Sequence, residues 1–379
     1  METLKLSKEQ ALSLVKKIEF DEVVKNTFCK ELNNSLYEKY ESFASNPLLL
    51  NIMLLTFQKH ASIPERLNDF YEEAFVTLFN VHDATKDSYV RDIRSGLGCE
   101  DFKLIFSYIC FKSYFNGEFE FSETRLRFHI QQAKTKFDRF NFTIEDFQED
   151  LTQSVCMLIK EGLIYRFSHR SFQEYFAAWY TCKLVDDVQS KLLLSWIKES
   201  DSVFSDSYFT MLFDLQSEKV NKIVICPILK KVQKFYIQFG FSLEFLEILF
   251  EGIRLRKQFM HNNKVHYGSS LTIKNQYLCN GLLLNSKLNE FPYENYNENE
   301  NRNIYNKLKE AYLSNSHEKN VYSFYMPFSQ VLDVISEREL LDYLSWFKKQ
   351  IEYAIQIIEK YDDTNIGRKR KVTTILDEL

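Results

Sequence analysis

The chain is poor in the residues that make turns and has no long apolar runs. Only nine glycines and five prolines occur among 379 residues, which favours long helices over sheet. No run of about 18 apolar residues occurs, so the sequence predicts no segment that spans a membrane. Residues 1–8 have no long apolar core and do not form a secretory signal. We therefore expect a cytoplasmic protein.

Paired cysteines are also missing. The chain has seven cysteines, an odd number, and none lies in a Cys-x-x-Cys pair. This pattern argues against a disulfide framework and against a zinc site, so no metal is expected. Six histidines show no matching pattern of cysteine, serine or carboxylate residues: His60, His82, His129, His261, His266 and His317. The sequence therefore predicts no catalytic residues.

A phosphate-binding loop of the form Gly-x-x-x-x-Gly-Lys-Ser/Thr is absent as well. Without this loop a chain has no cradle for the β- and γ-phosphates of a nucleotide and no hydroxyl ligand for magnesium. We expect that this chain by itself does not hydrolyse ATP and is not an enzyme. The formal net charge of -5 gives the whole chain no electrostatic footprint for nucleic acid.

The clearest local pattern lies over residues 163–180. Residues 163–167 are apolar or aromatic apart from one arginine, which predicts a short strand. Ser171 and Glu174 have the spacing of a capping box, which predicts the start of a helix. His169 then lies just ahead of a helix N-terminus, where free N–H groups and the helix dipole favour an anion. Without further information, a lone histidine is more often a surface residue or a satisfied core residue.

Two segments carry a family resemblance. They are Phe167-Ser-His-Arg-Ser-Phe-Gln-Glu-Tyr-Phe-Ala-Ala and, upstream, Phe43-Ala-Ser-Asn-Pro-Leu-Leu-Leu-Asn-Ile-Met-Leu-Leu. The first resembles the end of the winged-helix domain of NACHT proteins, a branch of the STAND signalling ATPases. The second is similar to the NACHT helical-domain motif, and Ile63-Pro64 and the helix expected over 67–79 also fit. The resemblance covers about half of the chain, roughly residues 1–185.

The resemblance implies roles for two residues. In NACHT proteins the proline of Asn-Pro-Leu-Leu-Leu lies against the adenine, and the winged-helix histidine contacts the β-phosphate of bound ADP. By motif match these roles fall on Pro47 and His169. ADP or ATP would be bound only together with a nucleotide-binding domain, because this chain resembles the region that follows that domain.

We expect a mainly α protein made of three parts. A helical domain is predicted over 1–82 and a winged-helix domain with a short β-hairpin over 98–185. An α-helical C-terminal sensor or partner region is predicted over 186–379. A polar connector is expected over 83–94, and Ser7 and Gln10 have capping-box spacing at the start of the first helix.

The predicted winged-helix segment has further local signals. Residues 117–123 alternate like a short strand, and Ser122 is expected to cap the helix that follows. Thr143 opens another helix, with Leu158 near its end and Gly162 suited to its C′ position. This helix is acidic, which would repel DNA phosphates, so nucleic-acid binding through it is not expected.

The C-terminal region shows only helical patterns. They lie over 223–250 and 271–284, and no repeat period is evident. Residues 288–306 interleave Asn and Glu and predict a flexible segment. Ser336 and Glu339 have capping-box spacing at the start of a last long helix. Its apolar stripe is typical of a core, with a partner-binding face as the less common alternative.

The basic run Arg368-Lys-Arg-Lys371 near the end of the chain could contact nucleic acid or an anionic surface, although most such runs are simply solvated.

We interpret the chain as the regulatory and sensing half of a NACHT-type switch that closes on ADP and forms a homo-oligomer on activation. The Asn-, Lys- and Phe-rich composition is typical of AT-rich bacterial genomes, where related proteins serve antiphage defence. Two alternatives stay open. One is an interaction module that never binds nucleotide, and the other is a winged-helix regulator that binds nucleic acid. A P-loop ATPase encoded directly upstream would favour the switch.

Overall fold

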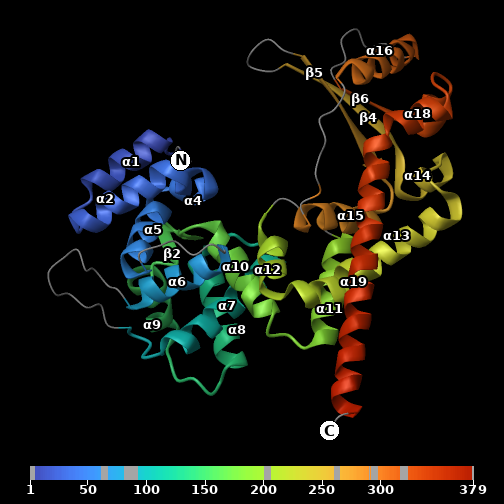
Figure 1. Ribbon diagram of the computed structural model, residues 1–379. Coiled ribbons are helices and arrows are strands. Elements are labelled where there is room, and N and C mark those ends of the chain that lie inside the picture. Colours follow the sequence, from blue (N-terminus) through green and yellow to red (C-terminus); the bar gives the residue numbers. More distant parts are fainter. Residues whose placement is uncertain are drawn as a thin grey trace. The chain divides into compact units, whose positions relative to one another are not determined.

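The structure is a computed structural model that describes residues 5–60, 67–80, 93–199, 206–259, 265–289, 291, 298–315 and 323–377. Most of these residues are helical, which confirms the predicted mainly α fold class (Figure 1). The chain divides into two compact units. The first comprises Met1–Leu184 and Asp206–Gln216, and the second comprises Val185–Ser205 and Ser217–Leu379. The features predicted at Ile63-Pro64, over 83–92 and over 293–297 lie outside the described residues.

The first unit opens with short helices around a buried one. They are α1 (Lys8–Lys17), α2 (Glu22–Glu31), α3 (Tyr37–Lys39), α4 (Glu41–Ala44), α5 (Pro47–His60) and α6 (Leu67–Asn80), with a π-helical turn over Leu32–Leu36. The predicted capping box at Ser7 is confirmed, because Ser7 Oγ accepts from Gln10 N–H and Gln10 Oε1 accepts from Ser7 N–H. Helix α5 is apolar on most sides and lies in the core.

Helices and a small sheet follow in the same unit. They are α7 (Cys99–Phe115), β1 (Glu120–Ser122), α8 (Glu123–Lys136), α9 (Ile144–Glu149), β2 (Leu158–Glu161), β3 (Ile164–Phe167) and α10 (Arg170–Thr181), with a π-helical turn over Asp150–Ser154. The three strands are antiparallel in the order β1-β3-β2. As predicted, a strand precedes α8, Ser122 caps it, and Thr143 caps α9.

The predicted course of the helix after Thr143 is wrong at its end. Helix α9 stops at Glu149, and Leu158 belongs to strand β2, where it pairs with Phe167. Gly162 is therefore not a helix C′ residue. Its φ of 62° lies in the region that glycine tolerates best, and it forms the turn that joins β2 to β3.

Aromatic side chains fill the core between α6, α7 and α10. Tyr71 of α6 stacks on Tyr175 of α10, with ring centroids 5.1 Å apart, and Phe75 packs edge-on against Phe176 at 5.2 Å. The segment 206–216 closes this core from the start of helix α12 (Tyr208–Val220), where Tyr208 is fully buried. Burial of rings of this size contributes a large share of the folding free energy.

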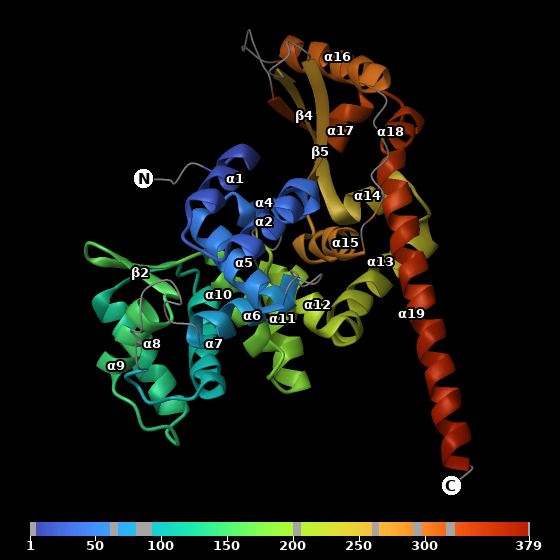
Figure 2. The same ribbon diagram turned by 60° about the vertical axis from the view of Figure 1, so that its left-hand side comes forward.

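The second unit combines helices with a sheet. Its other helices are α11 (Asp186–Glu199), α13 (Cys226–Phe239), α14 (Leu243–Leu249), α15 (Gln276–Leu288), α16 (Glu298–Asn315), α17 (Phe328–Leu332), α18 (Glu337–Tyr343) and α19 (Ser345–Asp377), with a π-helical turn over Asn221–Ile225. Both views show α13 and α15 beside α19 (Figure 2). Strands β4 (Phe250–Phe259), β5 (Val265–Ile273) and β6 (Ser323–Pro327) form an antiparallel sheet in the order β5-β4-β6.

This sheet corrects the prediction of a wholly helical C-terminal region. Along β4, Ile253 and Leu255 are buried while Arg254 and Arg256 are exposed, and that alternation is the period of a strand. Leu271, which we placed in a helix, belongs to β5 and pairs with Ile253.

Two further predictions for this region need correction. The segment 288–306 is not flexible throughout, because Glu298 begins helix α16, whose Ile304 and Tyr305 are buried. The capping box at Ser336 is confirmed, but it opens the short helix α18. Leu344 leaves helical geometry, so the long helix α19 begins separately at Ser345.

Candidate functional site

His169 itself is the N-cap of helix α10. Its backbone is extended, with φ -151° and ψ 137°, and its Nδ1 atom accepts a hydrogen bond from Ser171 N–H at 3.2 Å. The predicted capping box of Ser171 and Glu174 is therefore wrong, and the helix begins at Arg170. An imidazole nitrogen takes the place of the usual serine or aspartate oxygen and satisfies one of the free N–H groups of the helix start.

The contacts of Nδ1 determine the tautomer of His169. The Ser171 amide can only donate, so a protonated Nδ1 would bring two N–H groups face to face. Nδ1 is therefore an acceptor, and the Ser171 hydroxyl, whose Oγ lies 2.5 Å away, donates to it as well. Burial lowers the pKa of His169 below its ordinary value of 6.5, which keeps the ring neutral at pH 7. In the neutral ring the remaining proton lies on Nε2.

The Nε2–H group is a hydrogen-bond donor with no partner among the described residues. A neutral donor at a helix start suits an anionic oxygen.

Pro47 is the first residue of α5, directly after the N-cap residue Asn46. The Asn46 Oδ1 atom accepts from Leu48 N–H at 3.0 Å and from Leu49 N–H at 3.2 Å. Proline suits this position because its missing N–H would have no helical partner. The Asn-Pro pair therefore caps and starts helix α5.

Phe43 brings the two resembling segments together. Its ring lies over the His169 ring with centroids 6.3 Å apart and planes 27° from parallel. Phe43 begins the upstream segment and lies four residues before Pro47, so the helical segment forms one wall of the His169 surroundings. Sequence reasoning did not identify Phe43, since an aromatic residue at that position looks like ordinary core.

Arg170, the next residue, is held by acidic partners. Its Nε lies 3.2 Å from Glu174 Oε1, a terminal nitrogen lies 3.6 Å from Asp206 Oδ2, and its guanidinium stacks 3.9 Å from the Phe119 ring centroid. These contacts neutralise the arginine charge and fix its direction. His169, rather than Arg170, is the candidate anion contact of this helix start.

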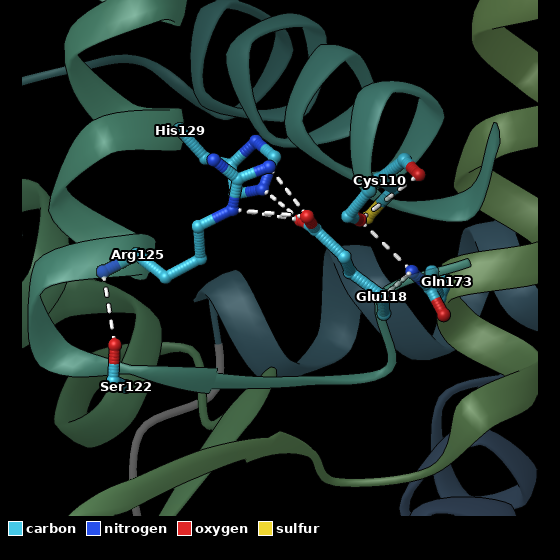
Figure 3. Close-up of polar contacts among 7 residues, drawn as sticks. Cys110, Glu118, Ser122, Arg125, His129 and Gln173 are labelled. Atoms are coloured by element: carbon cyan, nitrogen blue, oxygen red, sulfur yellow. Dashed lines mark hydrogen bonds and ion pairs between the residues drawn. The ribbon is translucent and has the colours of Figure 1, made fainter. Parts of the chain in front are cut away.

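A second polar cluster lies between α7 and α8. His129 is 1% exposed, and its Nε2 lies 2.5 Å from Glu118 Oε2. Arg125 Nε lies 3.0 and 3.1 Å from the two oxygens of the same carboxylate. Figure 3 shows both side chains converging on Glu118. The sequence showed no carboxylate pattern around His129, and the fold brings Glu118 to it. The Arg125–His129 spacing of one helical turn was the available signal.

The charge states in this cluster follow from its burial. Burial lowers the pKa of His129 below 6.5 and outweighs the effect of Glu118, which raises it. Burial raises the pKa of Glu118, but the hydrogen bonds from Arg125 and His129 outweigh it and lower that pKa overall. A neutral His129 thus donates from Nε2 to a charged carboxylate. Its Nδ1 has no hydrogen-bond partner among the described residues, so protonation there would bury an unpaired donor.

Gln173 links this cluster to α10. Its Nε2 donates to Ser113 Oγ and to the Glu118 carbonyl oxygen, each at 2.8 Å (Figure 3). Gln173 lies one helical turn after His169 and is fully buried. The cluster therefore fixes α10 against α7 and against the segment that leads into strand β1.

Acidic side chains accompany the predicted winged-helix segment. Glu145 and Asp146 lie in the first turn of α9, as the sequence indicated. On the sheet, Arg166 Nε lies 2.8 Å from Glu120 and its Nη1 lies 3.1 Å from Glu161, so two carboxylates surround one cation. These contacts offset the positive charge of Arg166, which would otherwise attract phosphates. The side chains of the basic run 368–371 are outside the described residues.

Two features of the described residues bear on other functions. Among them, no group of three or more His, Cys, Asp and Glu residues could hold a metal ion. None of the helices in the described ranges is both long enough and apolar enough to cross a bilayer. The seven cysteines are free thiols.

Comparison with known proteins places the C-terminal part of the chain. No curated protein matches the sequence. Residues 213–379 match the family model described as Short NACHT-associated C-Terminal domain, family 7. The match covers most of the second unit, and it lies outside the two segments that carry the NACHT resemblance. Residues 213–379 are thus similar to a C-terminal domain associated with NACHT proteins, which agrees with the resemblance carried by the two upstream segments.

Proposed function

We propose that this chain is the regulatory and sensing half of a NACHT-type STAND switch, with His169 as the contact to the β-phosphate of ADP. The observation that carries the proposal is the free Nε2–H donor of His169, which is presented at the start of α10 beside Phe43. The association of residues 213–379 with NACHT proteins supports the partner that the proposal needs, a NACHT ATPase domain. ADP would hold the switch closed, and its release would permit ATP binding and homo-oligomerisation.

The NACHT domain would hydrolyse ATP, and this chain would hold the ADP-bound state closed. The phosphates would be cradled by the P-loop of that domain, which this sequence lacks. The purified chain alone should show no ATP turnover. Pro47 would lie against the adenine in the same closed state, and an antiphage role follows from the family resemblance.

The test is substitution of His169 in the chain joined to its NACHT domain. One hydrogen bond to a charged oxygen contributes about 1.5–3 kcal/mol, so loss of the donor should weaken ADP retention roughly 10- to 150-fold. ATP affinity should change less, and oligomers should form without a trigger. Nucleotide release and particle mass would be measured on the same samples.

His169→Ala alone is not decisive, because the structure shows that this residue also caps α10. Loss of a cap costs about 0.5–2 kcal/mol of stability, so His169→Ala should also destabilise the isolated chain. His169→Ser is the matched variant, because it keeps a capping oxygen and removes the Nε2 donor. Weakened ADP retention in both variants supports the proposal. If His169→Ser restores both stability and ADP retention, His169 is only a cap, and the interaction module that ignores nucleotide becomes the better interpretation.

A further inference from the structure

We propose that the exposed face of the β5-β4-β6 sheet binds single-stranded nucleic acid through Arg254, Arg256 and Tyr325. This gives a ligand class to the second unit, for which the proposed function names a sensing role but no ligand. The inference rests on the proposed function only for the role of that ligand as a trigger. Binding itself is a property of this chain and can be measured without a NACHT domain.

One face of the sheet is buried. Ile253 and Leu255 of β4 and Phe324 of β6 are each at most 3% exposed. Helix α16 covers this face, because the rings of Tyr305 and Tyr312 pack on Phe324 at centroid distances of 5.7 and 5.0 Å. Both views show α16 beside the strands (Figures 1 and 2). Since side chains alternate along a strand, the residues between these positions lie on the opposite face.

Two arginines lie on that opposite face. Arg254 and Arg256 are exposed, and the strand separates their Cα atoms by roughly 6–7 Å. Neither arginine has a hydrogen bond or an ion pair with any residue that the structure describes. In register, Ser270 and Tyr325 lie beside Arg254, and Ser323 lies beside Arg256. None of these neighbours is acidic, so the sheet leaves both positive charges uncompensated on a chain with a formal net charge of -5.

Tyr325 adds an aromatic ring to the same face. It is partly exposed, whereas Phe324 and Met326 on either side of it are each 3% exposed. In the part of the chain that the structure describes, its ring makes no aromatic or cation–π contact and its hydroxyl makes no hydrogen bond. The ring is therefore available to stack on a flat group of a ligand.

Together these groups fit an unpaired nucleic-acid strand. Arginine, serine and tyrosine side chains are typical contacts to phosphates, and the spacing of the two arginines suits successive phosphates of an extended strand. The bases of a single strand are free to stack on an aromatic side chain, whereas those of a duplex stack on one another. An acidic peptide would use the two arginines and leave the Tyr325 ring without a partner, so the combination favours nucleic acid.

The test is fluorescence anisotropy of labelled oligouridylate and oligothymidylate with the whole chain. Probes of roughly 20 nucleotides are longer than the roughly 4–16 that one small β domain covers. The logarithm of the binding constant should fall with the logarithm of the salt concentration with a slope of about -1.4, from about -0.7 for each of two phosphate contacts. Arg254→Gln and Arg256→Gln should each remove about 0.7 from this slope and weaken binding about 2- to 5-fold, as expected for one exposed ion pair.

Tyr325→Leu removes the ring and no charge. It should weaken binding about 5- to 150-fold, as expected for the loss of one stacked base, and leave the salt slope unchanged. Tyr325→Phe keeps the ring and should bind within about 2-fold of the wild type, because stacking needs only the aromatic face. Far-UV circular dichroism and the melting temperature check that each variant is folded.

Arg338→Gln is the control, because Arg338 of α18 is also exposed and lies outside the sheet. It changes the net charge by the same amount and should bind as the wild type does. The inference is wrong if the wild type does not bind the probes saturably at low salt, or if Arg338→Gln loses as much affinity as the two sheet variants. Tighter binding of polyglutamate or of anionic lipid vesicles than of either oligonucleotide would also overturn it.

A second arm separates this inference from the proposed function. In the chain joined to its NACHT domain, the oligonucleotide should raise the fraction of oligomers formed with ATP, and the double variant of Arg254→Gln and Arg256→Gln should abolish this response. If the oligonucleotide binds and the oligomers do not respond, the binding surface stands and its role as a trigger site is refuted. Loss of the proposed ADP contact at His169 would leave the anisotropy results unchanged.

Discussion

Phe43 stacks over His169 at a centroid distance of 6.3 Å and thereby joins two sequence segments that resemble NACHT proteins. The same phenylalanine meets Phe70 edge-on at 4.9 Å and is 3% exposed, so it is a core residue as well as a neighbour of the candidate site. Any change at Phe43 should therefore affect stability and His169 together.

Phe43→Ala should lower the free energy of unfolding by about 3–5 kcal/mol, because it leaves a cavity among aromatic rings. Phe43→Leu keeps most of the buried apolar volume and should cost clearly less. Urea unfolding of the two variants and the wild type measures both losses. If both variants lost the same free energy of unfolding, the core would have closed around the smaller side chain, and the volume of Phe43 would not determine stability.

Stability should fall as the pH drops from 7.5 to 5.5. Burial lowers the pKa of both His129 and His169 in the folded chain, whereas unfolded histidine titrates near 6.5. The unfolded chain therefore binds more protons below about pH 6.5, and the stabilisation that is complete above this pH is lost as the pH falls towards the folded-state values. The melting temperature at several pH values measures the loss.

His129→Gln isolates one contribution to this pH dependence. Glutamine can still donate to Glu118, and it does not titrate. The groups around His129 are Glu118, Arg125 and Lys112, and none of them titrates ordinarily between pH 5.5 and 7.5. The variant should lose less stability over this range than the wild type does. An identical loss would mean that His129 is not buried as a neutral ring.

Lys103 should be important for stability although it carries a charge. It is 4% exposed and lies 2.6 Å from Glu72 and 2.8 Å from Glu100. Lys103→Met leaves the half-buried Glu72 without its cation and should cost about 1–3 kcal/mol. Glu100→Gln is the control, because Glu100 is 74% exposed and its pair should contribute at most about 1 kcal/mol. Urea unfolding midpoints compare the two, and a larger loss for Glu100→Gln would contradict this ranking.

Gly252 and Gly281 both leave too little room for a Cβ atom, but the obstructing atoms differ. They belong to the backbone at Gly252 and to a side chain at Gly281. A Cβ atom at Gly252 would meet the Met326 carbonyl oxygen and lie 2.7 Å from Pro327 Cα, both on the backbone of the paired strand β6. A Cβ at Gly281 would press on the side chain of Ile228, with 3.0 Å to its Cβ.

Gly252→Ala should therefore be the more damaging change, since overpacking costs about 1–3 kcal/mol even where side chains can shift. Gly281→Ala should be partly rescued by Ile228→Ala, which removes the obstructing methyl group, whereas that second change should not rescue Gly252→Ala. Thermal melting of the single and double variants tests both statements. If Ile228→Ala also rescued Gly252→Ala, the backbone of β6 would not be the cause of the damage at Gly252.

Local signals in the sequence predicted local structure well. The capping boxes at Ser7 and Ser336 and the cap at Ser122 are confirmed, because each depends on residues within one helical turn. The cap of α10 was misassigned because serine is a preferred N-cap residue and histidine is not, so Ser171 was chosen over His169. The structure instead uses a ring nitrogen of His169, and only the surrounding aromatic core selects that arrangement.

Long-range pairs could not be predicted from a single sequence. Glu118 and His129 come together because α8 turns back along α7, and Tyr71 stacks on Tyr175 because α6 packs on α10. The hairpin of β4 and β5 was missed although Ile253 to Arg256 alternate, since a short alternation amid helical patterns is easily overlooked. The nucleotide roles of Pro47 and His169 stay predictions.

The chain passes between the two units three times, and this limits how one unit can be replaced by that of a related protein. The chain leaves the first unit after Leu184, returns to it for Asp206–Gln216, and then leaves it again. Within the returning piece, Tyr208 stacks on Tyr114 at 4.6 Å, and within the preceding piece the Ile197 carbonyl accepts from Asn280 at 2.7 Å. If two related chains were joined at a single point before residue 185, Tyr208 would come from the other chain, although it belongs to the first unit. If they were joined after residue 216, Ile197 would stay with the original chain, although it belongs to the second unit. Grafting a new second unit onto the first therefore requires two further junctions, one on each side of 206–216.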